Sequence, residues 1–150
     1  MERGGGLEMD LREGVERILK DVAKNVKSGY VDPQEVRNLA MVLLSAAILS
    51  GEDFYYVLSN ALYTLADALG AFLRVTSVPL SIEVRGRAEK MLEEVRLEVF
   101  GSLSTMAAAV ASNNQCEAMK SASELLRVSY KVNSLAENFK NILVTELEEE

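Results

Sequence analysis

Hydrophobic residues recur along this chain with the spacing of helices rather than of strands. From residue 10 to residue 27 an apolar position returns every three or four residues, and Ser28-Gly29 then ends the pattern. These apolar positions are Leu11, Val15, Ile18, Leu19, Val22 and Val26. Asp10 and Glu13 have the spacing of a capping box. The pattern therefore predicts a first helix from Asp10 to about Lys27.

The segment from Val36 to Leu73 is the most apolar part of the chain. Its only charges are Arg37, Glu52, Asp53 and Asp67. Asp32-Pro33-Gln34-Glu35 supplies the cap, proline and glutamate of a helix start, and Ser50-Gly51 divides the segment into two helices. So short a link makes them antiparallel neighbours. Because a surface helix shows only one apolar side, we expect this hairpin at the centre of a bundle or against another subunit, with Val36 to Leu49 as the central helix.

The second half of the chain predicts two longer helices. Residues 75–80 are β-branched and contain Pro79, which indicates a loop or at most a short strand. Ser81 caps a helix from Ile82 to about Ser112, with a possible kink at Gly101 and a run of small residues after it that favours close approach by another helix. The last helix has an apolar seam in unbroken 3,4 spacing. Its positions are Leu125, Val128, Val132, Leu135, Phe139 and Ile142.

These elements predict an all-α fold: a single-domain bundle of about five helices with an antiparallel central hairpin and two longer C-terminal helices. The length of 150 residues suits one domain, and 49% apolar and 26% charged residues are globular values. We expect residues 1–9 to form a flexible N-terminus and residues 10–147 the bundle. Residues 148–150 are expected to fray, because the helix macrodipole disfavours acidic side chains at a C-terminus.

Composition excludes several kinds of chemistry. The chain has no histidine, so it lacks an imidazole base, a Ser-His or Cys-His nucleophile and a Glu-x-x-His metal motif. Cys116 is the only cysteine and can form neither an internal disulfide nor a zinc site. We therefore expect no cofactor, no metal and no catalytic residue. No signal peptide or membrane-spanning segment is predicted, which favours the cytoplasm. The lack of histidine and tryptophan fits heat adaptation and equally fits chance in a short chain.

One polar stripe crosses the otherwise apolar helix after Gly51. Its residues follow spacings of three and four and therefore share one side of a helix. The stripe consists of Tyr56, Asn60, Tyr63, Asp67 and Arg74, with Asp53 before it. It is either the side that this helix shows to water or a surface for a ligand or a partner. If it were buried, the Asp67 carboxylate would need a partner such as Arg74 or a tyrosine hydroxyl.

Basic residues gather at two places. Arg17, Lys20, Lys24 and Lys27 lie along one side of the first helix, and Arg85 and Arg87 lie near the start of the fourth. They are possible nucleic-acid contacts, although glutamates four residues earlier can pair with Arg17 and Lys20 as on any solvated helix. The net charge is −7, and Glu146, Glu148, Glu149 and Glu150 contribute four of these negative charges. No general basic field is expected.

The leading hypothesis is a non-enzymatic helical interaction or scaffold protein that acts as a homo-oligomer or as a subunit of an assembly. The alternative is an auxiliary nucleic-acid-binding subunit of a ribonucleoprotein complex. In size and helical character the chain is similar to the small helical subunits of RNA-guided CRISPR effector complexes, an analogy of size and fold class alone. An enzyme working through Asp67 and the tyrosines is the third and weakest hypothesis.

Overall fold

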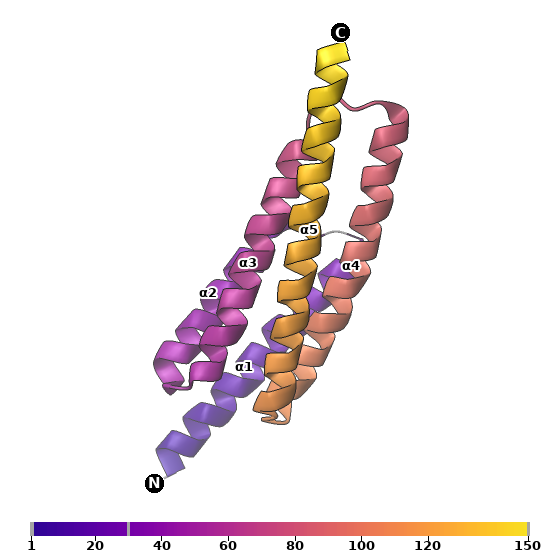
Figure 1. Ribbon diagram of the computed structural model, residues 1–150. Coiled ribbons are helices and arrows are strands. Elements are labelled where there is room, and N and C mark those ends of the chain that lie inside the picture. The colour runs from indigo at the N-terminus through magenta and orange to yellow at the C-terminus, as the bar shows by residue number, and fades with distance from the viewer. Residues whose placement is uncertain (1, 30, 150) are drawn as a thin grey trace.

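The fold is an all-α bundle whose helices alternate in direction along the chain (Figure 1). The computed structural model describes the backbone of residues 2–29 and 31–149. Its elements are α1 (Glu2–Lys27), α2 (Pro33–Ser50), α3 (Asp53–Thr76), α4 (Ile82–Ala111) and α5 (Gln115–Glu149). The predicted fold class, the antiparallel hairpin of α2 and α3 and the two longer C-terminal helices are confirmed.

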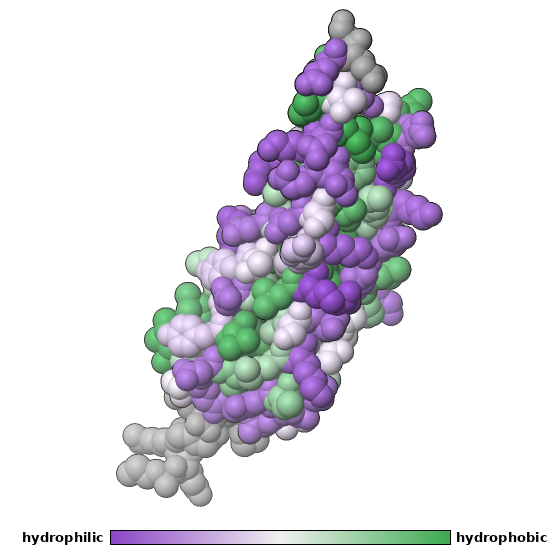
Figure 2. Space-filling model, viewed as in Figure 1, coloured by the Kyte–Doolittle hydropathy of each residue, from purple (hydrophilic) through white to green (hydrophobic). Residues whose placement is uncertain are grey.

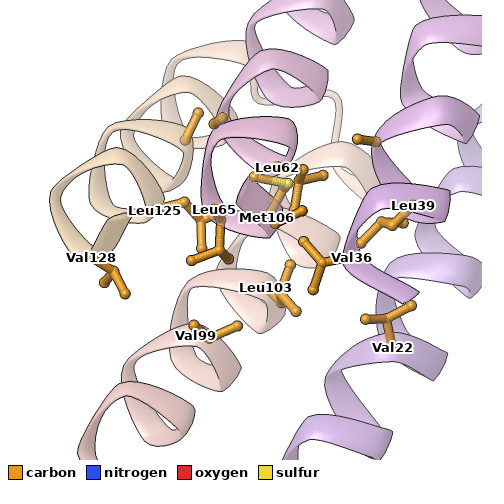
Figure 3. Close-up of a cluster of buried hydrophobic side chains, with 14 of the residues drawn as sticks. Val22, Val36, Leu39, Leu62, Leu65, Val99, Leu103, Met106, Leu125 and Val128 are labelled. Atoms are coloured by element: carbon orange, nitrogen blue, oxygen red, sulfur yellow. The ribbon is translucent and has the colours of Figure 1, made fainter. Parts of the chain in front are cut away.

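The five helices form a closed ring in which each packs against two others. The order around the ring is α1, α2, α3, α5, α4 and again α1. The contacts of α3 with α5 and with α2 are the most extensive, and that of α1 with α2 is the least. All five helices contribute to the core between them, for example through Val22, Leu39, Leu65, Leu103 and Leu125 (Figure 3). The ring is therefore tightest around α3 and weakest between α1 and α2.

The ends of α2 and the start of α4 follow the predicted turn chemistry. The Asp32 carboxylate accepts a hydrogen bond from the Gln34 backbone N–H at 2.9 Å. Gly51 adopts a left-handed conformation (φ 71°), and its N–H donates to the Ala47 carbonyl at 2.9 Å. The Ser81 hydroxyl accepts from the Val84 N–H at 3.3 Å. Local side-chain and glycine signals thus fix these helix ends.

One predicted boundary is wrong, at the start of the first helix. The first helix does not begin at Asp10 but runs back to Glu2, so Asp10 and Glu13 lie inside it and form no capping box. A capping signal permits a helix to start, but Asp and Glu also tolerate an exposed interior position, so the helix continues through them. At the other end of the chain α5 extends to Glu149. Met1 and Glu150 lie outside the described residues.

The two helices of the hairpin differ in how far they are buried. The side of α3 opposite its polar stripe is buried and consists of Phe54, Leu58, Ala61, Leu65, Leu69 and Phe72. By length and composition α3 is the one described helix that could cross a membrane, yet half of that stretch is buried inside the bundle, as in the core helix of a globular protein. The expectation that Val36 to Leu49 is the central helix is wrong. Only α3 and, weakly, α1 cover α2.

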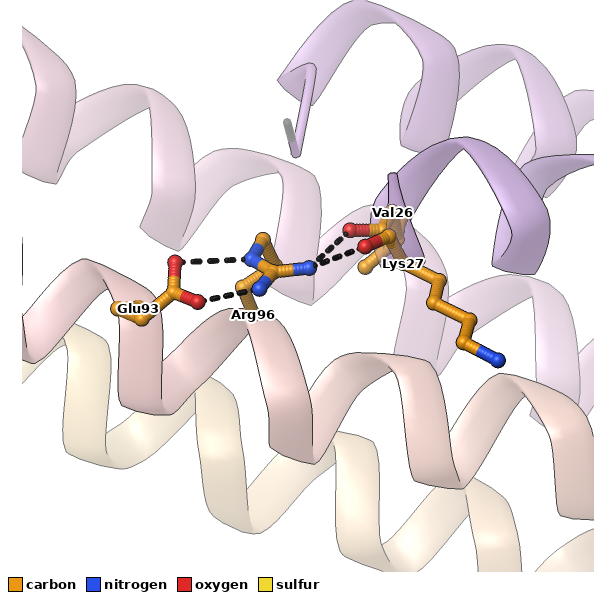
Figure 4. Close-up of polar contacts among 4 residues, drawn as sticks. All are labelled: Val26, Lys27, Glu93 and Arg96. Atoms are coloured by element: carbon orange, nitrogen blue, oxygen red, sulfur yellow. Dashed lines mark hydrogen bonds and ion pairs between the residues drawn. The ribbon is translucent and has the colours of Figure 1, made fainter. Parts of the chain in front are cut away.

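The C-terminal end of α1 is held by a side chain from α4. The Arg96 guanidinium donates to the backbone carbonyls of Val26 and Lys27 at 2.8 and 2.7 Å (Figure 4). It also donates to both carboxylate oxygens of Glu93, with the Nε contact at 2.9 Å. A cation is favourable where a helix leaves its last carbonyls without intrahelical partners. Arg96 thereby attaches the end of α1 to the middle of α4.

Glu93 predicts a pH dependence of stability. The hydrogen bonds from Arg96 hold the pKa of Glu93 below its ordinary value of 4.5. As the pH falls, the unfolded chain takes up this proton first, so the contribution of Glu93 is present above about pH 4.5 and is lost below it. We expect Glu93→Gln to lower the melting temperature at pH 7, and the difference from wild type to shrink towards pH 3. Circular dichroism melts measure it.

A matched control for this experiment is Glu94→Gln. Glu94 is exposed and has no ion pair among the described residues. It should show no such dependence on pH. A Glu93→Gln difference that stays constant from pH 7 to pH 3 would contradict the role assigned to the pair.

Candidate interaction surface

The outward side of α2 exposes large apolar residues. We call Gln34, Asn38, Met41, Ser45, Ile48 and Leu49 the α2 outer face. Relative exposure is 53% for Met41, 67% for Ile48 and 66% for Leu49. Hydrophobic side chains gather at the lower left of Figure 2, where Figure 1 places the turn between α2 and α3. No charged residue occurs between positions 38 and 51. The α2 outer face is thus uncharged and carries three exposed large apolar side chains.

A groove between α1 and α2 adjoins the α2 outer face. Its volume is about 250 Å³, and mainly apolar side chains line it, including Leu11 and Ile18 from α1 and Val42 and Leu49 from α2. The groove follows from the weak contact between these two helices, where the ring of helices is least closely packed. Leu49 belongs to both surfaces, so the groove extends the α2 outer face towards α1.

Charged residues lie at the two ends of the α2 outer face. Near the start of α2, Arg37 Nη2 pairs with Asp67 Oδ1 of α3 at 2.7 Å. Just after the end of α2, Glu52 and Asp53 form an acidic corner at the start of α3. The Asp67 carboxylate therefore has Arg37 as its partner and not Arg74. Both side chains of the Arg37–Asp67 pair are largely exposed, so it contributes at most about 1 kcal/mol.

The structure places the polar stripe of α3 at the surface beside α2. Tyr56, Asn60, Asp67 and Arg74 are exposed, whereas Tyr63 is half-buried and packs against the core. The stripe is joined to α2 by the Arg37–Asp67 pair. Ser59, one position before Asn60, also donates a hydrogen bond to the Ala40 carbonyl at 2.7 Å. The stripe therefore borders the α2 outer face.

The structure does not bring the two groups of basic residues together. Arg17, Lys20, Lys24 and Lys27 of α1 are all exposed. Lys20 pairs with Glu16 at 2.5 Å, and the Lys27 ammonium lies 5.5 Å from the Phe100 ring centroid. Arg85 and Arg87 are also exposed. The end of α1 meets α4 at Arg96, so these two arginines lie roughly 14–17 Å further along α4. They form two separate basic sites.

A second groove, which sequence reasoning missed, lies between α4 and α5. Its volume is about 580 Å³, and small residues such as Gly101, Ser102, Thr105 and Ser121 line part of it. Small residues after Gly101 were expected to let a helix press closely against α4. That holds for Ala107 and Ala109, which are buried, but at Gly101 and Thr105 the surface stays open. Here α4 is continuous and does not break at Gly101.

Neither a metal-binding site among the described residues nor a similar protein indicates a function. Among the described residues no group of three or more histidine, cysteine or acidic side chains is arranged to hold a metal, and Cys116 is an exposed free thiol in the first turn of α5. Comparison of the chain with protein-family models, curated proteins and solved structures finds no match, so its function has to be inferred from its surfaces.

Gly101 offers a stability test of the second groove. A methyl group added at Gly101 meets no atom within 4 Å. Because glycine costs a helix interior about 0.5–1 kcal/mol relative to alanine, Gly101→Ala should raise the free energy of unfolding by that amount. Gly51→Ala is the matched control and should lower it by about 1–2 kcal/mol, because Gly51 has a positive φ. Urea titration followed by circular dichroism measures both, and a destabilised Gly101→Ala would mean that the groove is closed.

Proposed function

We propose that this chain is a non-enzymatic helical interaction protein, a cytoplasmic subunit of a homo-oligomer or of a larger assembly. The α2 outer face is the surface that carries the proposal. A monomer rarely leaves a contiguous apolar patch of this kind in water unless it is an interaction site. The lack of histidine in the whole chain supports a role without catalysis.

The energetics favour a partner that brings apolar surface of its own. Burying one Met, Leu or Ile side chain gains about 1.5–3 kcal/mol, so Met41, Ile48 and Leu49 together supply several kcal/mol. Loss of translational and rotational freedom on association costs about 4–15 kcal/mol. These three residues alone offset only the lower part of that cost. The groove between α1 and α2 and the aromatic residue Tyr56, which is 45% exposed, add the remaining contact.

The α2 outer face predicts the mass of the protein in solution. The full chain should exceed its monomer mass of 16.5 kDa in multi-angle light scattering, either alone or with its partner. Ile48→Glu places a charge in the apolar contact and should raise the dissociation constant at least about tenfold. Tyr130→Glu is the matched control, since Tyr130 is 77% exposed on α5, and it should leave the mass unchanged. An Ile48→Glu variant that associates like wild type would contradict the proposal.

A second candidate function is the auxiliary nucleic-acid-binding subunit. It is supported by Arg17 and Lys24, which are exposed and have no ion pair among the described residues. It is weakened by the pairing of Lys20 with Glu16 and by the separation of Arg85 and Arg87 from α1.

Salt dependence separates the second candidate from the first. If α1 binds phosphates, fluorescence anisotropy should detect binding of single- or double-stranded RNA or DNA at low salt, with an affinity that falls steeply as salt rises. The double variant Arg17→Glu, Lys24→Glu should abolish this binding, whereas Arg127→Glu on α5 should not. No binding at low salt would remove this candidate.

A further inference from the structure

The partner of the α2 outer face can be identified from its own symmetry. We propose that it is a second copy of this chain, with α2 packed antiparallel against α2 of the second copy around a two-fold axis beside Ser45. This inference rests on the proposed function and specifies its partner. Four observations on α2 support it: the spacing of the exposed residues, their symmetry about Ser45, the position of the charges and the extent of the surface.

The exposed residues of α2 have the spacing of a helix-pairing seam. Gln34, Asn38, Met41, Ser45 and Ile48 are separated by alternating steps of four and three residues. Residues with this spacing form one narrow stripe that can pack against a like stripe of another helix. In α2 this stripe faces away from the core and meets neither α1 nor α3 over most of its width.

Apolar residues of the α2 outer face lie at equal distances on either side of Ser45. Met41 is four residues before it and Leu49 is four residues after it. Arg37 is eight residues before it, and Asp53 lies beyond the turn at Gly51, at the start of α3. In a two-fold contact every pairing occurs twice in reciprocal form. An antiparallel pair of α2 helices centred at Ser45 therefore places Met41 against Leu49 of the second copy. It also brings Arg37 to the Asp53 end of the second copy.

Ser45 suits the position on the axis. Its side chain is small, so two helices can approach closely there. Its hydroxyl donates to the Met41 carbonyl of its own helix at 3.0 Å. The hydroxyl is therefore satisfied within the chain, and covering it leaves no polar group without a partner.

The charges select the antiparallel arrangement. The α2 outer face itself carries no charge that would have to be desolvated. At its start, Arg37 is paired with Asp67, and the nearby Asp32 and Glu35 accept hydrogen bonds from Gln34 and Asn25. At its end, Glu52 and Asp53 have no ion pair among the described residues. A parallel pair would bring the two acidic corners together, whereas an antiparallel pair brings each of them to the Arg37 end of the other copy. The Arg37 guanidinium has five N–H donors and uses one for Asp67, so others are available to a carboxylate of the second copy.

The α2 outer face needs its flanking surfaces to reach the area of a dimer interface. The 18 residues of α2 span about 27 Å, and a standard interface needs about 800 Å² from each copy. One helix supplies only part of this area. Leu11 and Ile18 on the α1 side and Tyr56 on the α3 side extend the surface on both flanks.

Charge reversal at both ends tests the arrangement in the full chain. Arg37→Glu alone and Asp53→Arg alone each place two like-charge pairs in the dimer and should each raise its dissociation constant at least about tenfold. An equimolar mixture of the two variants forms a mixed dimer with both pairs restored and should return to the wild-type dimer mass. Arg127→Glu on α5 is the control and should remain dimeric. A mixture that stays monomeric, with both variants folded by circular dichroism, overturns the proposal.

A cross-link at the axis tests the same geometry without changing a charge. In a Cys116→Ser background, Ser45→Cys should form a disulfide-linked dimer on mild oxidation, because the residue meets its own copy. Ser123→Cys is the control, exposed on α5 and away from the axis, and should not cross-link efficiently. Equal cross-linking of the two variants would overturn the proposal.

The outcomes separate this inference from the function on which it rests. Suppose that Ile48→Glu lowers the mass, but Ser45→Cys does not cross-link and the mixture of Arg37→Glu with Asp53→Arg does not regain the dimer mass. The two-fold arrangement is then wrong, and the interaction function stands. If the wild-type chain is a monomer at every concentration, the second copy is excluded as the partner. If Ile48→Glu then also leaves binding to any co-purified protein unchanged, the interaction function fails as well.

Discussion

The structure depends on one geometric constraint, which is that each helix of a closed ring is covered by only two neighbours. A helix that is apolar on one side satisfies this arrangement completely. The helix α3 does so between α2 and α5, with its polar stripe outside. The helix α2 has apolar residues on both its inner and its outer side, yet its second neighbour, α1, touches it only lightly. The excess apolar surface of α2 is therefore a consequence of ring closure and not of poor packing in the core.

Much of the fold could be predicted because its signals are local. The start of α2 at Asp32-Pro33, its end at Gly51 and the cap at Ser81 each depend on one side chain or one backbone angle. The polar stripe of α3 was evident from periodicity alone. The start of α1 was not predictable, because an acidic residue inside an exposed helix resembles a cap. The partner of Asp67 was also beyond the sequence, since Arg37 is close to it only after the hairpin has formed.

The candidate site could be predicted only in part. The sequence indicated that residues 36–73 carry more apolar surface than a surface helix needs, but both helices of the hairpin looked alike. Which of them is covered depends on contacts with α1 and α5, which are far away in the chain. The stripe residues Tyr56 and Asp67 were correctly grouped on one side of α3, whereas their position beside the α2 outer face required the structure. The run of small residues after Gly101 was visible in the sequence. Whether such residues let a neighbouring helix pack closely or leave a groove depends on the position of that helix, here α5, which the sequence does not show.

The contact between Arg96 and the end of α1 has a consequence for the order in which the chain assembles. Arg96 follows Val26 by 70 residues. The side of α1 that packs on α4 therefore has no neighbour until α4 has been synthesised. During synthesis, which proceeds at about 5–20 residues per second, the α2–α3 hairpin is complete several seconds before α4 exists. The hairpin can form from contacts close in sequence, whereas the ring can close only after α5 has been made, because α5 is the neighbour of both α3 and α4. The hairpin that carries the α2 outer face can therefore pack before the rest of the molecule, whereas α1, although it is made first, gains its main contact only when α4 has been made.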